Sequence, residues 1–447
     1  MKMTKTELKQ NIVKIKKFLK QRDYDAIDTG IELARALDEP AVFEALLGGW
    51  SINEEGKLVL EEEYKGETLT KRWSDQSWSY FAYALVNLIC YAPKNINIDK
   101  TLEHSKIKTL HFSEYPWLEI PSGLANLPKL THLYLSDCVS LKNLDSLANL
   151  TNLTELTLFR CRYLQNVDGL ANLTNLTSLN LIDCDYLQNV DVLANLTNLT
   201  SLKIICLFMD GLQNIDVLAN LTNLTSLELS TSGVGIGKNV TKQYRINSIN
   251  HLIDVLANLT NLTSLYLKFT DSLQNVDGLA NLTNLTSLNL INCDSLQNVD
   301  GLANLTNLIR LELGDCNLLQ NVDGLASLPN LTSLRLHRGE YNYKFNLSFV
   351  IPNANGLANL TNLTNLELQG CDNLQNVDGL ANLPKLTSLD FSWCYSLQNV
   401  DSLANCTKLT SLNLRHCDKV QPKPSKDKMT TREEVAAYQE EIKKLIK

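Results

Sequence analysis

The chain has 447 residues, of which 44% are hydrophobic and 20% are charged, and its formal net charge is −8. No apolar run approaches the roughly 18 residues that would span a bilayer, so we expect no membrane insertion. The acidic balance also argues against nucleic-acid binding, which requires a basic stripe.

Residues 1–106 are predicted to form packed helices and a short hairpin. The first 21 residues place lysines and apolar residues at helical spacing and lack the pattern of a secretory signal. Helical spacing continues to a break at Pro40 and then resumes. A hairpin is expected near Asn53 to Gly56, and an apolar stretch covers Ser79 to Tyr91. Three tryptophans can supply a small core: Trp50, Trp73 and Trp78.

A 23-residue unit recurs thirteen times in residues 107–417, as in LTSLNLINCDSLQNVDGLANLTN at 285–307. Numbered from its first apolar residue, the unit reads Leu-x-x-Leu-x-Leu-x-x-Cys, then Leu-x-x-Val-Asp-x-Leu-x-x-Leu. This pattern is similar to a leucine-rich repeat, whose units stack because none can bury its apolar side alone. The units begin at Ile107, Leu130, Leu153, Leu176, Leu199, Leu224, Leu262, Leu285, Leu308, Leu331, Leu363, Leu386 and Leu409.

The period-2 pattern of each strand predicts which positions face inward. Leucines at positions 4 and 6 point to the core, and positions 3, 5 and 7 point to solvent. Aspartate at position 16 is a good helix N-cap, and a short 3₁₀ turn is expected after it. The predicted fold class is α/β: a leucine-rich repeat solenoid shaped as a horseshoe, with a parallel sheet on the concave face and short 3₁₀ turns on the convex face.

Cysteine occupies position 9 in eight units, where it could form disulfides, bind metal or build a buried ladder. No CxxC motif occurs, and a thiol that contacts backbone carbonyls once per unit is the favoured interpretation. Reduced cysteines fit a cytoplasmic compartment. The residues are Cys138, Cys161, Cys184, Cys293, Cys316, Cys371, Cys394 and Cys417.

The segment NVDGLANLTNLTSLNL resembles the repeats of internalin-type bacterial leucine-rich proteins, over about residues 107–417. The chain differs from them at position 9, where cysteine replaces asparagine. The resemblance implies a horseshoe that binds other proteins. It also implies an alternative role, as an exported adhesin or effector that binds a host protein or glycan.

Residues 418–447 are predicted to be a linker and a C-terminal amphipathic helix. Thr431 and Glu434 have the spacing of a capping box. The helix is expected either to dock on the last repeat or to bind a partner as a short coiled coil. Residues 1–106 are expected to be a helical cap on the other end of the array. The apolar face of the C-terminal helix comprises Val435, Tyr438, Ile442 and Leu445.

No catalytic constellation, cofactor site or metal site is predicted. The stretch GVGIGKN at 233–239 lacks the spacing of a phosphate-binding loop, and an insertion tip is the favoured interpretation. His111 and His132 lie on neighbouring strands, but nothing defines a metal geometry for them.

Exposed positions differ from unit to unit, whereas scaffold positions repeat. Position 5 varies freely, which indicates a recognition surface or neutral drift on a solvated face. An apolar group at position 7 is predicted to continue from 206 to 209, and a basic group to lie further along. Two larger insertions, near 230–251 and 337–353, should emerge at the strand exits and flank the sheet. The predicted partner-binding residues are Phe159, Ile182, Ile205, Phe208, Tyr266, Arg310, Arg335, His337, Arg338, Trp393 and Arg415.

The sequence therefore predicts a non-enzymatic, cytoplasmic protein–protein interaction scaffold. We expect a monomer without cofactors that binds a protein partner through the concave sheet and the insertion-bearing edge. Secretion by a route without a recognisable signal peptide is the alternative localisation.

Overall fold

The structure is a computed structural model. It describes residues 3–21, 23–37, 39–47, 50–52, 58–60, 62–64, 67–69, 83–85, 87–88, 108–113, 127, 129–206, 214–231, 251–268, 273–293, 295–337, 351 and 353–446.

The chain divides into two compact units. The N-terminal unit comprises Met1–Leu199, Lys203–Leu207 and Gly211–Val217, and the C-terminal unit comprises Thr200–Leu202, Phe208–Asp210 and Leu218–Lys447.

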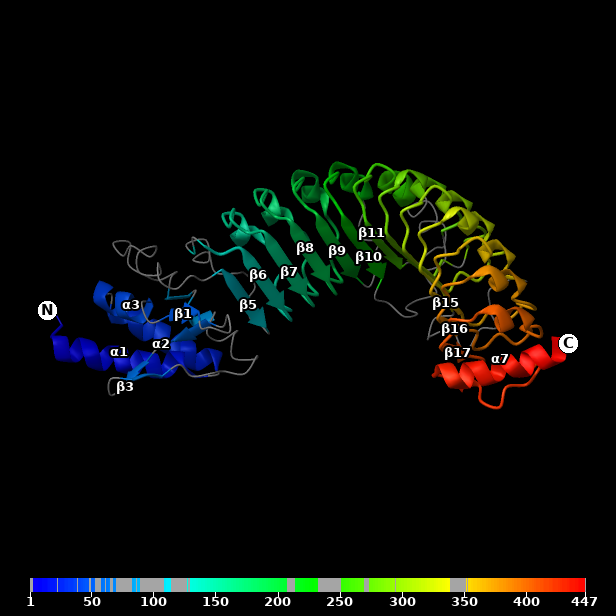
Figure 1. Ribbon diagram of the computed structural model, residues 1–447. Coiled ribbons are helices and arrows are strands. Elements are labelled where there is room, and N and C mark those ends of the chain that lie inside the picture. The colour runs from blue at the N-terminus through cyan, green and yellow to red at the C-terminus, as the bar shows by residue number, and fades with distance from the viewer. Residues whose placement is uncertain are drawn as a thin grey trace. The chain divides into compact units, whose positions relative to one another are not determined.

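Three helices open the N-terminal unit: α1 (Lys5–Leu19), α2 (Tyr24–Leu37) and α3 (Pro40–Leu47) (Figure 1). A capping box formed by Thr4 and Glu7 begins α1. Pro40 is the first residue of α3, a position where its missing N–H costs no helical hydrogen bond. The helices pack through fully buried apolar residues that include Leu19, Ile27 and Phe43. The predicted N-terminal helices are therefore present.

Two short antiparallel hairpins follow these helices. The expected hairpin pairs β1 (Trp50–Ile52) with β2 (Leu58–Leu60), and the second, which the sequence did not suggest, pairs β3 (Glu62–Tyr64) with β4 (Glu67–Leu69). In the predicted apolar stretch, Tyr83, Leu85 and Leu88 are buried. The Trp50 side chain, Trp73 and Trp78 lie outside the described residues.

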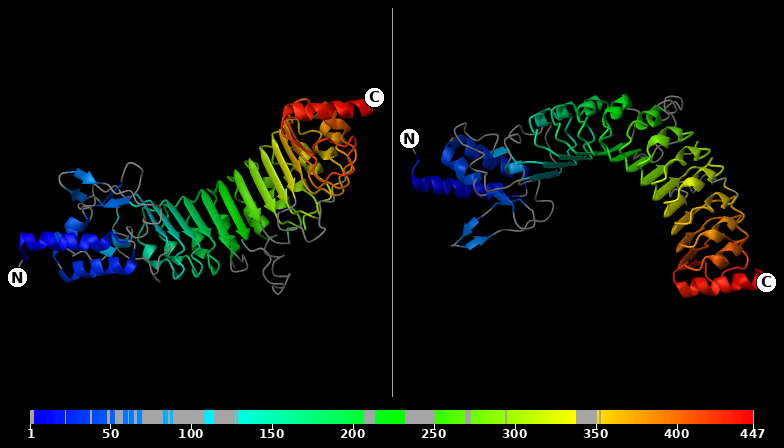
Figure 2. Two further views of the ribbon diagram at one scale, coloured as in Figure 1. Left: turned by 90° about the horizontal axis from the view of Figure 1, so that it is seen from below. Right: turned by 45° about the horizontal axis from the view of Figure 1, so that its top comes forward.

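One sheet of 14 strands carries the repeats, with β5 to β17 in chain order and β18 added antiparallel at the end (Figures 1 and 2). The thirteen strands β5 to β17 correspond to the thirteen predicted repeats. Their bounds are β5 (Thr109–Ser113), β6 (His132–Ser136), β7 (Glu155–Phe159), β8 (Ser178–Ile182), β9 (Ser201–Cys206), β10 (Ser226–Thr231), β11 (Ser264–Lys268), β12 (Ser287–Ile291), β13 (Arg310–Gly314), β14 (Ser333–His337), β15 (Asn365–Leu368), β16 (Ser388–Asp390), β17 (Ser411–Asn413) and β18 (Lys428–Met429).

Equivalent repeat positions pair across neighbouring strands, so like residues stack on like. Leu288 is opposite Leu311 and Leu311 is opposite Leu334, and all three are at most 1% exposed. This register keeps the leucines of positions 4 and 6 on one side of the sheet in every unit. The predicted inward face is confirmed, and positions 3, 5 and 7 form the opposite, exposed face.

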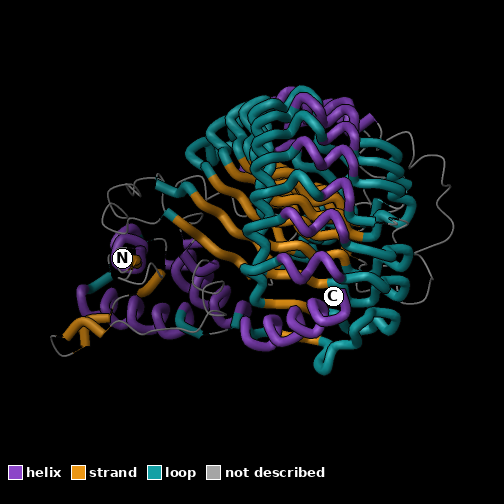
Figure 3. Tube along the Cα trace, turned by 45° about the vertical axis from the view of Figure 1, so that its right-hand side comes forward, coloured by secondary structure: helices purple, strands orange, loops and turns teal. Residues whose placement is uncertain are grey.

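Short 3₁₀ turns stack on the side away from the exposed sheet face (Figure 3). They are η2 (Asp145–Leu147), η3 (Asp168–Leu170), η4 (Asp191–Asn195), η6 (Ile215–Asn220), η7 (Asp277–Asn281), η8 (Asp300–Leu302), η9 (Asp323–Ser327), η10 (Asn355–Leu357), η11 (Asp378–Asn382) and η12 (Asp401–Asn405).

The prediction that aspartate at position 16 caps these turns is wrong. In η3, Asp168 is already the first residue of the turn, and Val167 before it provides no side-chain cap. The Asp168 N–H instead donates to Oδ1 of Asn166 at 3.2 Å, because an asparagine can accept from the backbone two residues further on. The same bond recurs in other units, where the accepting side chains are Asn143, Asn189, Asn275, Asn298, Asn321, Asn353, Asn376 and Asn399.

Two further ladders explain why threonine and asparagine repeat so strictly. Threonine at position 2 donates its hydroxyl to the position-2 carbonyl of the preceding unit, as Thr177 does to Thr154 at 3.1 Å. Asparagine at position 23 donates its amide to the preceding turn, as Asn307 does to the Thr283 carbonyl at 2.9 Å. The asparagine bond gives a partner to a backbone carbonyl just before a strand. The threonine bond adds to a carbonyl that already accepts backbone N–H groups, as Thr154 does from Thr177 and Ser178.

The predicted cysteine ladder is confirmed. All eight position-9 thiols are free and buried. Cys161 donates to the carbonyl of Leu135 at 3.8 Å, and Cys394 donates to that of Leu368 at 2.9 Å. A thiol fits this position because it is a weak donor on an otherwise apolar side chain.

The C-terminal helix α7 (Arg432–Ile446) docks on the last repeat, as one of the two alternatives predicted. Val435, Tyr438 and Ile442 are buried there. Gln439 is buried as well, and its Nε2 donates to the carbonyls of Leu403 at 2.7 Å and Cys406 at 3.0 Å.

The face predicted for this helix was wrong at Leu445, which is 63% exposed. The expected capping box is only half formed, since the Glu434 N–H donates to Thr431 Oγ1 at 3.3 Å but its carboxylate accepts from the Thr430 N–H at 2.8 Å. The preceding segment is more than a linker, because it contains β18. None of the described helices is both long enough and apolar enough to cross a membrane.

Candidate protein-binding surface

The exposed face of the sheet carries one row of position-5 side chains, and most of them differ from their neighbours. In the N-terminal unit this row contains no acid, and in the C-terminal unit it contains four acids and one arginine. The row comprises His111, Tyr134, Thr157, Asn180 and Lys203, then Glu228, Tyr266, Asn289, Glu312, Arg335, Glu367, Asp390 and Asn413.

Glu312 on β13 is the centre of a polar network on this face. Its Oε1 accepts from Arg335 Nη1 at 3.0 Å and contacts His337 Nε2 at 2.8 Å. Its Oε2 accepts from Asn289 Nδ2 at 2.8 Å. The hydrogen bond to His337, helped by the charge of Arg335, lowers the pKa of Glu312 below its usual range.

Arg335 on β14 bridges two strands, because its Nε also donates to Glu367 Oε2 at 2.8 Å. The predicted basic group is therefore a mixed-charge network at Arg335 and His337. Arg310, at position 3 of its repeat and the first residue of β13, is exposed and makes no ion pair within the described part of the chain. Arg338 lies outside the described residues.

Gly314 gives His337 the room to reach this network. A Cβ at Gly314 would lie 2.9 Å from His337 Cε1 and 2.9 Å from Ile291 Cδ1. The three residues are position 7 of neighbouring strands, so the histidine ring lies over the strand that lacks a side chain. Any larger residue here would force the ends of the His337 and Ile291 side chains to move.

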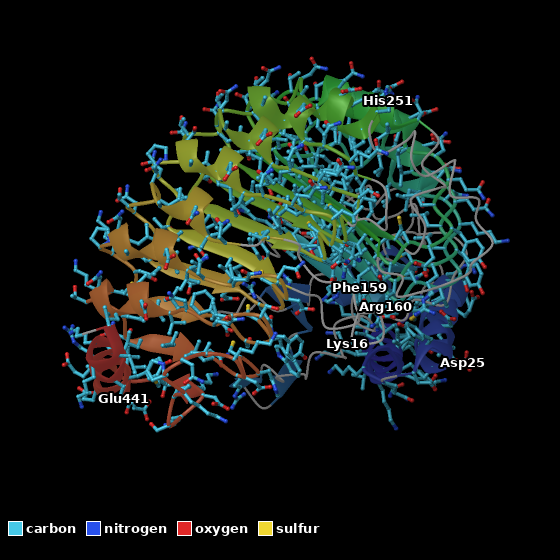
Figure 4. The ribbon with its side chains drawn as sticks, turned by 90° about the vertical axis from the view of Figure 1, so that its right-hand side faces the viewer. Lys16, Asp25, Phe159, Arg160, His251 and Glu441 are labelled. Carbon is cyan, nitrogen blue, oxygen red and sulfur yellow. The ribbon has the colours of Figure 1, made fainter. Side chains whose placement is uncertain are left out.

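In the N-terminal unit, the predicted contact residue Phe159 makes a cation–π contact with Arg160. The Arg160 guanidinium lies 4.8 Å from the centre of the Phe159 ring, and the two side chains are neighbours in Figure 4. Arg160 also lies 3.9 Å from Asp137 and 3.7 Å from Asp183. Its side chain remains 48% exposed, so these ion pairs are weak.

Beside this group, two tyrosines form an exposed pair that the sequence reading missed. Tyr163 and Tyr186 stack with ring centres 5.4 Å apart and are 53% and 57% exposed. Both occupy position 11, and tyrosine at this position in two consecutive units was the available signal. Exposed aromatic pairs are common where proteins bind partners.

The predicted apolar group at position 7 is only partly present. Ile182 and Ile205 are half-buried on the exposed face, as is Phe159. Cys206 was expected to extend this group but points inward and is 2% exposed, because it follows Ile205 by one residue along a strand. Phe208 lies outside the described residues, as do GVGIGKN and most of both larger insertions.

Trp393 and Arg415 lie at the exits of the last two repeat strands. The Trp393 ring stacks on that of His416 with centres 3.8 Å apart, and it meets Tyr395 edge-on at 6.2 Å. The backbone N–H of Trp393 donates to the backbone carbonyl of Arg415 at 2.8 Å. Tyr266 is half-buried in the middle of the position-5 row.

Position 8, one to three residues after the strand, has positive φ in eight described units. Asp137, Asp183, Asn292, Asp315 and Gly370 are residue types that tolerate this conformation. Histidine also tolerates it, as His416 does at φ 62°, whereas Arg160 and Trp393 hold it at φ 55° and 68° although their side chains disfavour it.

The thiols are poor candidates for chemistry. Burial raises the pKa of Cys406 to about 11 and raises the pKa values of Cys184 and Cys394 well above the ordinary range. They stay protonated at neutral pH, and a protonated thiol is a weak nucleophile and metal ligand. Among the described residues, no group of three or more His, Cys, Asp or Glu side chains could hold a metal ion.

Comparison with known families identifies this repeat. The family model of BspA-type leucine-rich repeat regions matches six copies over residues 210–331 and 341–446, just over half of the chain. The chain belongs to the leucine-rich repeat family. Residues 62–161 also match the R13L1/DRL21 leucine-rich repeats. No curated protein matches this leucine-rich repeat protein significantly.

One similar solved structure supports the same fold, and two further ones are similar over part of their length. An internalin, InlF, from Listeria monocytogenes is 22% identical, covers 75% of this chain and 92% of its own, and has a TM-score of 0.53. Internalin C2 from the same organism is 28% identical over 51% of this chain and 92% of its own, with a TM-score of 0.37. The functional domain of its InlJ, described as including a cysteine ladder, is 19% identical over 72% and 71%, with a TM-score of 0.42.

These comparisons confirm an internalin-like repeat fold. Arrays of this kind generally mediate protein–protein interaction, because their stacked strands present an extended surface.

Proposed function

We propose that this leucine-rich repeat protein is a non-catalytic scaffold that binds a protein partner through the exposed sheet face and the strand-exit edge. One observation carries the proposal. The threonine, asparagine and cysteine ladders recur in most units, whereas the exposed position-5 row changes from unit to unit. Individual side chains on a uniform frame support recognition of a specific partner. The exposed Tyr163–Tyr186 pair adds the aromatic character that interfaces favour.

Affinity capture from native cells tests the proposal. We would change Phe159, Tyr266, Arg310 and Trp393 to Ala together, since Arg310 can be removed without breaking the Glu312 network. A matched variant changes four exposed threonines beside the 3₁₀ turns to Ala. The expected result is loss of a specific partner only with the first variant. Equal recovery with both variants, or no specific partner for the unchanged chain, contradicts the proposal. The control residues are Thr174, Thr283, Thr306 and Thr407.

We further propose that the protein acts as a monomer in the cytoplasm. The free thiols support a reducing compartment, where unpaired cysteines are usual. The alternative is an exported protein that binds a host protein or glycan, which the likeness to internalins favours. Cell fractionation separates the two, because surface or secreted material would overturn the cytoplasmic assignment.

A further inference from the structure

The last two repeats hold an aromatic stack where the backbone disfavours it. Trp393 and His416 occupy position 8 in consecutive units, with φ of 68° and 62°. Asn292 and Gly370 hold the same position elsewhere without comparable strain. Bulky residues persist in such a conformation when something other than local stability requires them.

The strained Trp393 and its neighbour His416 place aromatic surface at the strand exits. Trp393 stacks on His416 with an interplanar angle of 25°, and Tyr395 meets the tryptophan at 79° while remaining 41% exposed. The hydrogen bond from the Trp393 N–H to the Arg415 carbonyl fixes the tryptophan backbone beside Arg415. Arg415 and His416 are both exposed.

Basic side chains flank this aromatic surface. Lys428 on β18 is directly opposite Asn413 on β17, so both side chains lie on the exposed sheet face. Arg415 lies two residues beyond Asn413, where the chain leaves that strand. Residues 415–428 contain five Lys or Arg residues and two Asp residues, in contrast with the acidic excess of the repeats.

The acid on this part of the sheet does not neutralise these cations. Asp390 Oδ1 accepts from the N–H and the hydroxyl of Ser392 at 2.8 and 2.5 Å. Its Oδ2 accepts from Asn413 Nδ2 at 2.7 Å. Within the described residues, neither Arg415 nor Lys428 forms an ion pair. The combination of aromatic faces and positive charge is therefore open to a ligand.

We propose that Trp393, Tyr395, Arg415, His416 and Lys428, the C-terminal aromatic surface, bind an acidic segment of a partner protein. Carboxylates of the segment pair with Arg415 and Lys428, and an aromatic or apolar side chain packs on Trp393 and Tyr395. Charge complementarity selects this occupant, because a basic segment would meet like charges. The inference rests on the proposed scaffold function and names the chemistry of one contact.

The test uses the full chain and a fluorescein-labelled random copolymer of glutamate and tyrosine, followed by fluorescence anisotropy. Trp393→Asn places at this position a residue that Asn292 shows to be compatible with positive φ, so the variant should fold. It should weaken binding by roughly tenfold or more, as expected for a central aromatic anchor. Arg415→Glu combined with Lys428→Glu should abolish binding. Arg160→Asn, the same change at the same position in the N-terminal unit, is the matched control and should leave binding unchanged.

Three results would overturn the proposal: no binding of the acidic copolymer, equal binding of a lysine–tyrosine copolymer, or equal loss with Arg160→Asn. Heparin provides a further arm. Heparin binding that depends on Arg415 and Lys428 but not on Trp393, together with copolymer binding that is equally independent of Trp393, would indicate a general anion surface instead. If Trp393→Asn leaves copolymer binding intact while the quadruple Ala variant still loses its cellular partner, only this inference fails. If no cellular partner is captured, the scaffold proposal fails independently of it.

Discussion

Two arginines of this protein, Arg335 and Arg160, illustrate different uses of the repeat surface. Arg335 extends from a regular strand and is held by Glu312 and Glu367 at 3.0 and 2.8 Å. Arg160 lies just beyond its strand, in backbone of positive φ, with its two aspartates at 3.7 Å or more. The first stabilises neighbouring strands, whereas the second is maintained against local preference. Strain combined with weak pairing therefore marks Arg160 as a side chain whose presence local stability does not explain.

The largest effect on the free energy of unfolding is expected at Gly314, below the Glu312 network. Gly314→Val adds a Cβ that would lie 2.9 Å from both His337 Cε1 and Ile291 Cδ1, so these two side chains must move. Overpacking of this kind costs about 1–3 kcal/mol in the free energy of unfolding. Chemical denaturation measures it, and the loss should shrink in a His337→Ala background. An unchanged midpoint in the original background would contradict the tight fit.

A smaller effect is expected from Glu312→Gln, which removes the charge that Arg335 and His337 contact. Exposed and partly exposed ion pairs contribute up to about 1 kcal/mol. The folded protein lowers the pKa of Glu312, so its contribution is present above the unfolded value, near 4.3, and is lost as pH falls through the folded value. As the pH falls below about 5, the free energy of unfolding should therefore decrease less steeply for the variant than for the original protein. Parallel curves would show that the network adds nothing.

Arg160→Asn should act in the opposite direction. Asparagine tolerates positive φ, and relief of this strain is worth on the order of 1 kcal/mol, less the weak ion pairs that are lost. The melting temperature should stay constant or rise. Arg335→Asn is the matched comparison and should lower it. A fall with Arg160→Asn as large as with Arg335→Asn would remove the distinction between the two arginines.

The smallest effect is expected from Tyr163→Ala. The ring is 53% exposed and contacts Tyr186, so its loss should change the free energy of unfolding by about 0.5 kcal/mol or less. The same variant should reduce capture of a partner that uses this edge. A large loss of stability would assign the tyrosine pair a structural role.

The scaffold could be predicted residue by residue because comparison of the repeats separates the positions that they share from the positions that vary. Thirteen copies identify the leucines of positions 4 and 6, the thiol ladder and the short turns, because stacking favours the same residue types at these positions in most units. The turn cap was misassigned between Asp168 and Asn166, because both residues repeat equally and both can accept backbone hydrogen bonds. Periodicity alone does not distinguish them.

The sequence by itself determined the repeat and the side of the sheet on which each residue lies, since a period of two assigns alternate residues to opposite faces. Only the tertiary structure decided which exposed charges neutralise one another, because Glu312, Arg335 and Glu367 are 23 and 32 residues apart along the chain and meet only through strand register. The positive φ at Trp393 and His416 was likewise decided by the turn after the strand, which eight described units make with different side chains.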